Sequence, residues 1–253
     1  YQVMAAMMLV GILTTLFTPE PDSLDEEETD SDTKQSALWA RMTAWTLKAV
    51  FEPFLEFMQR PGWHLVLLFI LLYKFGDALA GVMSNPLYVE LGYSAKEVAT
   101  ISKAFGLWAT IIGAVIGGSI VHRLGIMKSL LLCGLLQMIS NLMFVWLAVV
   151  GHNMSVLILT IAIENLSGGM GTAAFVAYLS GLCNIAYTAT QYALLSSFMA
   201  TGRTLLASSG GWLADQMSWV SFFLVTTAAA LPGLILLIWM MKRYPATRGV
   251  EEN

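Results

Sequence analysis

Long apolar stretches dominate the pattern of this chain, and mostly short polar segments separate them. Seven stretches reach or approach the length of a membrane-crossing helix: residues 1–17, 65–84, 98–121, 124–150, 156–182, 185–207 and 220–241. A helix needs about 20 mostly apolar residues to cross a bilayer, and open sheets cannot cross because their edge amides would stay unpaired in lipid. The pattern therefore predicts an all-α integral membrane protein in which successive spans are antiparallel neighbours.

Local signals mark where several spans begin, end or pack. Residues 94–97 read S-A-K-E, the pattern of a capping box, and predict the start of the third span. We expect Pro86 to end the second span and Pro232 to kink the last one. Gly113 and Gly117 form a G-x-x-x-G pair, which indicates close packing of the third span against another helix.

A polar linker, residues 18–62, separates the first span from the second. Its acidic part, residues 19–33, holds eight carboxylates and no aromatic residue, and we expect it to be disordered. Apolar residues recur at helical spacing through residues 36–58 and predict an amphipathic helix with a break near Pro53. This helix either lies on the membrane surface or packs against the bundle.

The composition excludes a soluble protein. Hydrophobic residues make up 57% and charged residues 12% of the 253 positions, whereas soluble domains carry about 25% charged residues. The net charge of −4 comes from the linker, because without its eight acids 13 basic residues would face nine acidic ones. No basic stripe exists to neutralise phosphates, so we expect no nucleic-acid partner.

Lysine and arginine residues lie almost entirely on one side of the predicted membrane. That side collects Lys34, Arg41, Lys48, Arg60, Arg123, Lys128, Lys242, Arg243 and Arg248. The opposite loops, residues 85–97, 151–155 and 208–219, contain only Lys96. Since cytoplasmic loops are enriched in positive residues, we expect the linker and the C-terminus to be cytoplasmic.

Signatures of catalysis and of metal binding are missing from the sequence. The three histidines are isolated: His64, His122 and His152. Cys133 and Cys183 form no C-x-x-C pair, and the run G-G-M-G at residues 168–171 lacks the ending of a phosphate loop. We interpret that run as a thin helix face or a point of flexing, and we expect neither an enzyme nor a cofactor. A membrane-embedded transferase would need a His/Asp cluster at a span end, whereas a non-transporting signalling or assembly subunit stays open.

Ionisable residues inside apolar spans are the main functional signal. Placing each charged side chain in the membrane costs about 2.5–3.5 kcal/mol by the lower estimates, so such residues indicate a function. Lys74 and Asp77 lie at i and i+3 and can pair on one helix face, either as a structural ion pair or as a titrating pair that lines a polar cavity. Glu164 has no basic residue in its own span, so it either makes an interhelical hydrogen bond or binds and releases protons. The helix face of Glu164 continues towards Tyr178.

A row of polar residues follows one side of the sixth stretch. Asn184, Thr188 and Gln191 have i, i+4, i+7 spacing, and Tyr187 and Tyr192 lie alongside. Amides and phenols in lipid need partners. The row therefore indicates either bonds between helices or a path lined for a sugar or a peptide.

Two basic residues near span ends have two interpretations. Lys103 lies two turns into the third span, and Arg203 lies near the outer end of its helix. Each side chain either extends to the lipid headgroups or turns inward, where it would pair with carboxylates of a cargo.

Three long motifs resemble one transporter family. They read YKFGDALAG at residues 73–81, ENLSGGMGTAAF at 164–175 and YTATQYALLSS at 187–197. They closely resemble the AmpG muropeptide permeases, a bacterial branch of the major facilitator superfamily. The similarity runs from TTLFTPEP at residues 14–21 to about Pro245, and only the acidic linker falls outside it.

The resemblance implies the C-terminal half of such a permease. Residues 1–17 would be the end of its sixth helix, 63–245 its C-terminal six-helix domain and 246–253 a cytoplasmic tail. The partner would then be the N-terminal half of the same transporter. In the gating loop the family expects Asp before Arg, whereas this chain has His122 before Arg123, which weakens the transfer of that role.

The function implied by the resemblance is import of anhydromuropeptides across the bacterial inner membrane, driven by protons, for wall recycling and, in some bacteria, β-lactamase induction. In that mechanism Asp77 and Glu164 would carry the proton. The expected cargo contacts are Lys74, Asn165, Tyr178, Asn184, Thr188, Gln191 and Tyr192, with Lys103 and Arg203 as further partners for cargo carboxylates. A relative that carries another anionic solute, such as acetyl-CoA, is the alternative within transport.

Overall fold

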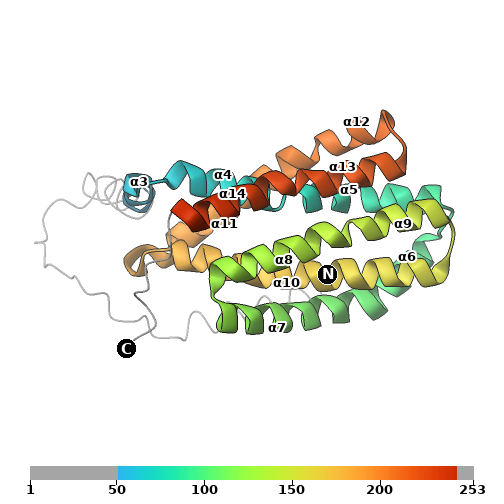
Figure 1. The fold of residues 1–253 in the computed structure, drawn as a ribbon, viewed down its shortest axis with the longest axis horizontal. Coiled ribbons are helices and arrows are strands. Elements are labelled where there is room, and N and C mark those ends of the chain that lie inside the picture. The colour runs from blue at the N-terminus through green and yellow to red at the C-terminus, as the bar shows by residue number, and fades with distance from the viewer. Residues whose placement is uncertain (1–50, 244–253) are drawn as a thin grey trace, which may run out of the picture. The chain divides into compact units, whose positions relative to one another are not determined.

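The computed structural model describes residues 51–243, and every regular element in that range is a helix (Figure 1). The elements are α3 (Glu52–Gln59), α4 (Trp63–Tyr73), α5 (Phe75–Glu90), α6 (Ala95–Ile101), the π-helix η2 (Ser102–Gly106), α7 (Leu107–Leu124), α8 (Ile126–Ser140), α9 (Leu142–Val150), α10 (Met154–Leu182), the 3₁₀-helix η3 (Ile185–Tyr187), α11 (Thr188–Ala207), α12 (Ser209–Asp215), α13 (Trp219–Ala229) and α14 (Leu231–Arg243). The predictions for the first span, the acidic linker, residues 36–50 and the tail lie outside the described residues.

Five of these helical stretches are long and apolar enough to cross a membrane: Trp63–Glu90, Ala95–Leu124, Ile126–Val150, Met154–Leu182 and Trp219–Arg243. They confirm every predicted span in the described range except the sixth, at residues 185–207. That stretch forms η3 and α11, whose polar residues lower its hydropathy below that of the other five. The protein is thus an all-α membrane protein.

Breaks in the helices fall at single residues inside the spans. Lys74 separates α4 from α5, Asn141 separates α8 from α9, and Ala230 separates α13 from α14. The last break lies two residues before Pro232 and confirms the predicted kink. The prediction that Pro86 ends a helix is wrong: α5 continues to Glu90. A proline inside a helix removes one hydrogen bond and crowds the preceding turn, but Leu87 and Tyr88 in the next turn are buried and favour continuation of the helix.

Two further predictions concern the start of the third span and the segment that follows α11. The capping box is confirmed, since the Ser94 hydroxyl accepts from the Glu97 amide and the Glu97 carboxylate accepts from the Ser94 amide at 2.8 Å. The loop expected at residues 208–219 is partly helical, because α12 occupies Ser209–Asp215.

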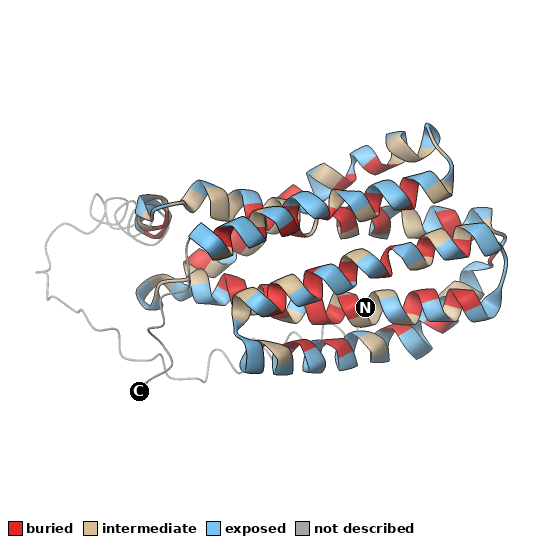
Figure 2. Cartoon of the chain, in the orientation of Figure 1, coloured by how far each residue is buried: buried red, intermediate tan, exposed pale blue. Residues whose placement is uncertain are grey.

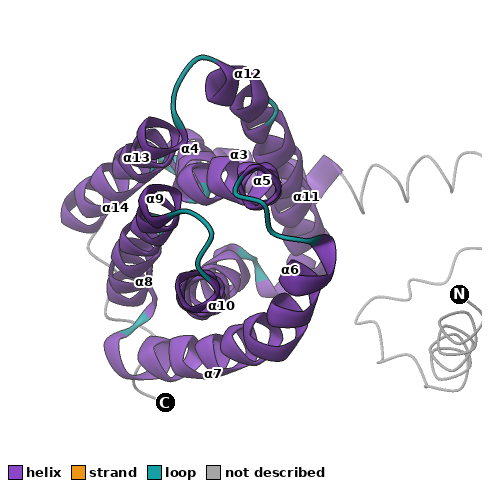
Figure 3. Cartoon of the chain, turned by 90° about the vertical axis from the view of Figure 1, so that its right-hand side faces the viewer, coloured by secondary structure: helices purple, strands orange, loops and turns teal. Residues whose placement is uncertain are grey.

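The helix α10 lies among α7, α8 and α9, and Figure 3 shows this arrangement from one end of the bundle. Glycines bring α7 and α10 into backbone contact, which confirms the close packing predicted for the G-x-x-x-G pair. A Cβ atom at Gly117 would lie 2.6 Å from the Met170 carbonyl oxygen, and one at Gly113 would collide with the Leu166 carbonyl oxygen.

Buried apolar side chains form two clusters, and buried positions follow the inward faces of the helices (Figure 2). The first cluster joins α3, α4, α8, α10, α11 and α14 and includes Phe57, Phe69 and Phe175. The second joins α5, α6, α9, α10 and α13 and includes Leu87, Phe144 and Phe223.

Candidate functional site

Polar residues occupy the segments of the helices that lie between the two apolar clusters. On α10, for example, Ile161 belongs to one cluster and Met170 to the other, and Glu164 lies between them. The same order holds on α4–α5, α8–α9 and α13–α14. We call this set the polar layer; it comprises Lys74, Asp77, Gln137, Ser140, Asn141, Glu164, Ser167 and Thr226. We add Arg203 of α11, which is exposed, because its charge acts on Asp77.

An ion pair lies at the break between α4 and α5. The Lys74 Nζ atom lies 3.4 Å from Asp77 Oδ2, and the two side chains are 16% and 21% exposed. Asp77 lies in the first turn of α5, where the exposed amides and the helix dipole stabilise a negative charge. The same ammonium group donates a hydrogen bond to Gln137 Oε1 of α8 at 3.2 Å.

Two further charges act on this pair from other helices. Glu164 of α10 and Arg203 of α11 both interact electrostatically with Asp77, and Glu164 also interacts with Lys74 and Arg203. A Cβ atom at Gly81 of α5 would lie 3.8 Å from Arg203 Nη2, so the guanidinium packs against a glycine of the helix that carries Asp77. Of these four predicted residues, Lys74 and Asp77 are in direct contact, whereas Glu164 and the exposed Arg203 act on them through space.

Asn165 and Tyr178 also lie on α10 but have other surroundings. The Asn165 Oδ1 atom accepts a hydrogen bond from Thr110 Oγ1 of α7 at 3.1 Å, and its Nδ2 donates to the Ile161 carbonyl at 2.7 Å. Tyr178 is buried in the first apolar cluster, edge-on to Phe69 with ring centroids 5.2 Å apart. Its hydroxyl has no hydrogen-bond partner among the described residues.

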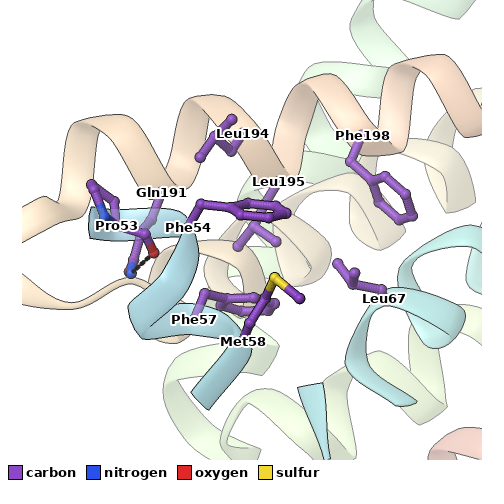
Figure 4. Close-up of a pocket in the computed structure, with 9 residues that line it drawn as sticks. All are labelled: Pro53, Phe54, Phe57, Met58, Leu67, Gln191, Leu194, Leu195 and Phe198. Atoms are coloured by element: carbon purple, nitrogen blue, oxygen red, sulfur yellow. Dashed lines mark hydrogen bonds between the residues drawn. The ribbon is translucent and has the colours of Figure 1, made fainter. Parts of the chain in front are cut away.

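The polar row of the sixth stretch reaches α3 through Gln191, which Figure 4 shows beside Pro53 of that helix. Gln191 Nε2 donates to Glu56 Oε2 at 2.5 Å and to the Pro53 carbonyl at 3.0 Å. Gln191 Oε1 accepts a hydrogen bond from the backbone N–H of Asn184 at 2.7 Å. Thr188 Oγ1 donates to the Asn184 carbonyl at 2.9 Å. These bonds satisfy the row within the protein and fix α3, the described end of the predicted amphipathic helix, on the bundle.

The carboxylate of Glu56 is the centre of this second polar group. Burial raises its pKa, but hydrogen bonds from Arg60 and Gln191 and the charge of Arg60 outweigh that effect, and the pKa of Glu56 falls below its ordinary value. Arg60 pairs with it at 2.8 Å. Beside this group, apolar side chains of α3, α4 and α11 line a cavity of about 210 Å³, shown in Figure 4.

The remaining predicted residues lie apart from both polar groups. Lys103 is exposed in η2, and short π-helices of this kind often mark functional sites. His122 and Arg123 are exposed in the last turn of α7, where positive charge complements the helix dipole. Tyr192 packs against the first apolar cluster. Within residues 51–243 no group of three or more His, Cys, Asp or Glu residues could hold a metal ion.

Comparison with known proteins gives the family. The family model described as Major Facilitator Superfamily matches residues 65–253. The chain belongs to the Major Facilitator Superfamily. Within this superfamily it is 38% identical over its whole length to the protein named "Anhydromuropeptide permease" of Escherichia coli K12, and it covers 48% of that protein.

Two Rickettsia relatives support the same placement in the superfamily. The chain is 38% identical over 199 residues to "Putative transporter AmpG 4" of Rickettsia conorii, which corresponds to 79% of this chain and 48% of the relative. It is 39% identical over 174 residues to "Putative transporter AmpG 1" of Rickettsia prowazekii, 69% of this chain and 39% of the relative. The chain therefore spans about half the length of these relatives and matches the C-terminal half of the E. coli permease.

The resemblance to AmpG permeases is thus confirmed, and the relatives are named as permeases and transporters rather than as enzymes. Sequence reasoning missed Gln137, a residue of the polar layer whose side chain bonds to the side chain of the predicted residue Lys74. A signal for it was present, because Gln137 and Asn141 are polar residues one helical turn apart in the middle of the apolar stretch 124–150.

Proposed function

We propose that this chain is the C-terminal half of a proton-coupled permease that imports anhydromuropeptides from the periplasm to the cytoplasm by alternating access. The identity of 38% over the whole chain to a protein named anhydromuropeptide permease supports the cargo. The observation that carries the proposal for the site is the cluster of Lys74, Asp77, Glu164 and Arg203 in the polar layer. Charges in such a position are costly, and a transporter has a use for them.

The acidic pair supplies the proton coupling in this proposal. In the outward-facing state Asp77 or Glu164 takes a proton, and the negative charge that holds Lys74 is neutralised. The ammonium group then becomes available to a carboxylate of the cargo. A neutral acid is also cheaper to carry past apolar neighbours than a carboxylate, so the loaded carrier rocks inward more readily than the unloaded one.

Cargo carboxylates would meet Lys74 and Arg203, with Lys103 as a further partner. The hydroxyl and amide groups of the cargo would meet the other predicted contacts, Asn165, Tyr178, Asn184, Thr188, Gln191 and Tyr192. The amides of Asn165 and Gln191 already have protein partners, so cargo contact at these positions exchanges one hydrogen bond for another. His122 and Arg123 would act in the gating loop.

The orientation in the membrane follows from the positive residues. Arg60, Arg123 and Lys128 lie in or beside connections on one side, and Lys242 and Arg243 end the last helix. By the positive-inside rule this side faces the cytoplasm, which supports a location in the bacterial inner membrane with α3 on the inner face.

Uptake of radiolabelled anhydromuropeptide into membrane vesicles tests the proposal. The full-length transporter containing this half is compared with its Asp77→Asn and Glu164→Gln variants, with and without an imposed proton gradient. We expect gradient-driven accumulation in the unaltered protein and its loss in at least one variant. If both variants accumulate cargo normally, the assignment of proton coupling is wrong.

The same assay separates the alternatives. Accumulation of acetyl-CoA or another anion, but not of muropeptide, would show a different cargo, and no accumulation of any solute would indicate a signalling or assembly subunit. Loss of uptake in Lys74→Ala with recovery in the double variant Lys74→Ala/Asp77→Asn would show that the ion pair has only a structural role.

A further inference from the structure

Gln137 is a buried amide in the polar layer for which neither the sequence motifs nor the relatives assign a role. Its side chain is 6% exposed, and its Oε1 atom accepts a hydrogen bond from Lys74 Nζ at 3.2 Å. Gln137 comes from α8, whereas Lys74 lies at the break between α4 and α5. The bond therefore joins two spans at the point where one of them is interrupted.

The glycine face of α10 makes room for the Gln137 side chain. A Cβ atom at Gly171 would collide with Gln137 Oε1, and one at Gly168 would lie 3.9 Å from Gln137 Nε2. The amide is thus confined between α10 and Lys74, and its position is set by packing from both sides. This contact also explains part of the G-G-M-G run, which matches no phosphate loop.

We propose that Gln137 is a positioning residue that holds the Lys74 ammonium group in place for a cargo carboxylate. The proposal rests on the proposed function in one respect, that the cargo is an anion. An ammonium group has three donors, and within the described residues its hydrogen-bond acceptors are Asp77 and Gln137. An amide accepts a hydrogen bond without neutralising the charge, and it does not titrate.

This difference between the Gln137 amide and the Asp77 carboxylate gives Gln137 a distinct role in the transport cycle. When Asp77 is protonated it no longer balances the charge of Lys74, and without a second acceptor the long side chain would be free to move. Gln137 keeps the ammonium group at the helix break through that step, with its charge still available. The titratable and charged groups around Lys74 are Tyr73 and Asp77 of its own span, Cys133 of α8, Glu164 of α10 and Arg203 of α11.

Two substitutions separate the chemistry of the amide from its shape. Gln137→Glu keeps the shape but adds a negative charge that competes with the cargo for Lys74. Gln137→Met keeps the length but removes the acceptor. Leu136→Met is the matched control, because Leu136 is the neighbouring residue on α8 and its side chain is exposed.

The first measurement is the KM for anhydromuropeptide uptake by the full-length transporter. We expect Gln137→Glu and Gln137→Met each to raise KM by about tenfold, the size of effect typical for a hydrogen bond to a charged group, with a smaller change in kcat. Lowering the pH should restore KM in Gln137→Glu, because the added carboxyl becomes neutral, but not in Gln137→Met. Leu136→Met should behave as the unaltered protein.

The second measurement needs no cargo. Lys74 in membranes is modified with a membrane-permeant amine-reactive acetylating reagent, and the rate is read by mass spectrometry relative to the exposed Lys103. Gln137→Met should raise the relative rate several-fold because Lys74 loses a partner, and Gln137→Glu should lower it because Lys74 gains a counter-charge. A purely structural role would shift both variants in the same direction.

The two measurements together decide the question. Unchanged modification of Lys74 in both variants overturns the proposal, whatever happens to KM. If the modification rates shift in opposite directions but the unaltered protein transports no muropeptide, the positioning role stands and the proposed cargo is wrong. If the unaltered protein transports muropeptide and neither KM changes, Gln137 does not position Lys74 for cargo.

Discussion

Substitution of Gly117 by alanine tests the backbone contact between α7 and α10. An added Cβ atom would lie 2.6 Å from the carbonyl oxygen and 2.7 Å from the Cα atom of Met170, whereas ordinary contact begins at 3.4 Å. Both atoms belong to the backbone of a helix of 29 residues, so no side-chain rotation relieves the clash. The two helices would have to separate by roughly 0.8 Å, the difference between 3.4 and 2.6 Å.

The magnitude follows from two opposing effects. Overpacking in a well-packed interior costs about 1–3 kcal/mol, and replacing glycine with alanine inside a helix returns about 0.5–1 kcal/mol. We therefore expect Gly117→Ala to lower the free energy of unfolding by about 0.5–2 kcal/mol, since the clash exceeds the gain. Equilibrium unfolding of the purified protein in mild detergent, followed by circular dichroism, measures this quantity.

Gly118 provides the matched control on the next residue of the same helix. A Cβ atom there would have nothing within 4 Å. Gly118→Ala therefore gives the helix the stabilisation of alanine over glycine without a steric clash, and it should raise the free energy of unfolding by about 0.5–1 kcal/mol. The two substitutions should thus change the free energy of unfolding in opposite directions. Equal destabilisation by both, or a Gly117→Ala variant as stable as the original, would refute the reasoning.

Three further predictions follow from other contacts. Gly76→Ala, whose Cβ would lie 2.6 Å from a backbone oxygen of α13, should destabilise the protein by about 0.5–2 kcal/mol in the same unfolding assay, whereas Gly211→Ala, with nothing within 4 Å, should not. The folded-state pKa of Glu56 lies below its ordinary value of 4.5, so the stability that Glu56 contributes is present above pH 4.5 and is lost as the pH falls through the folded-state pKa. The thermal midpoint of unfolding should therefore decrease as the pH falls below 4.5. Glu56→Gln should make this decrease smaller. A maleimide should modify the partly exposed Cys183 before the buried Cys133, and equal rates measured by mass spectrometry would contradict the packing around Cys133.

The spans could be predicted from the sequence because a membrane imposes a minimum apolar length, and particular residues fixed several of their ends. The Ser94–Glu97 box and the Pro232 kink are local events whose geometry depends on a few neighbouring residues. The prediction from Pro86 failed because the position at which a helix ends depends on packing as well as on backbone hydrogen-bond donors. Leu87 and Tyr88, buried after the proline, keep the last turn of α5 helical.

The partners of the site residues could not be predicted in the same way. A span is apolar towards lipid and towards its neighbours alike, so periodicity does not show which face of α8 meets Lys74, and Gln137 went unassigned. Asp77, Glu164 and Arg203 come from three helices far apart in the chain, and only the fold places them near one another. The polar row at Asn184 and Gln191 indicated a need for partners, but nothing in its spacing identified α3 as the partner.

The most direct test of proton coupling by the polar layer is a measurement of proton movement with cargo. The full-length transporter is reconstituted into proteoliposomes that enclose a pH-sensitive dye, and an inward gradient of anhydromuropeptide is applied without an imposed proton gradient. We predict acidification of the interior with the unaltered protein, and loss of that acidification in Asp77→Asn or Glu164→Gln. Absence of cargo-dependent acidification in the unaltered protein, or unchanged acidification in both variants, would contradict the account.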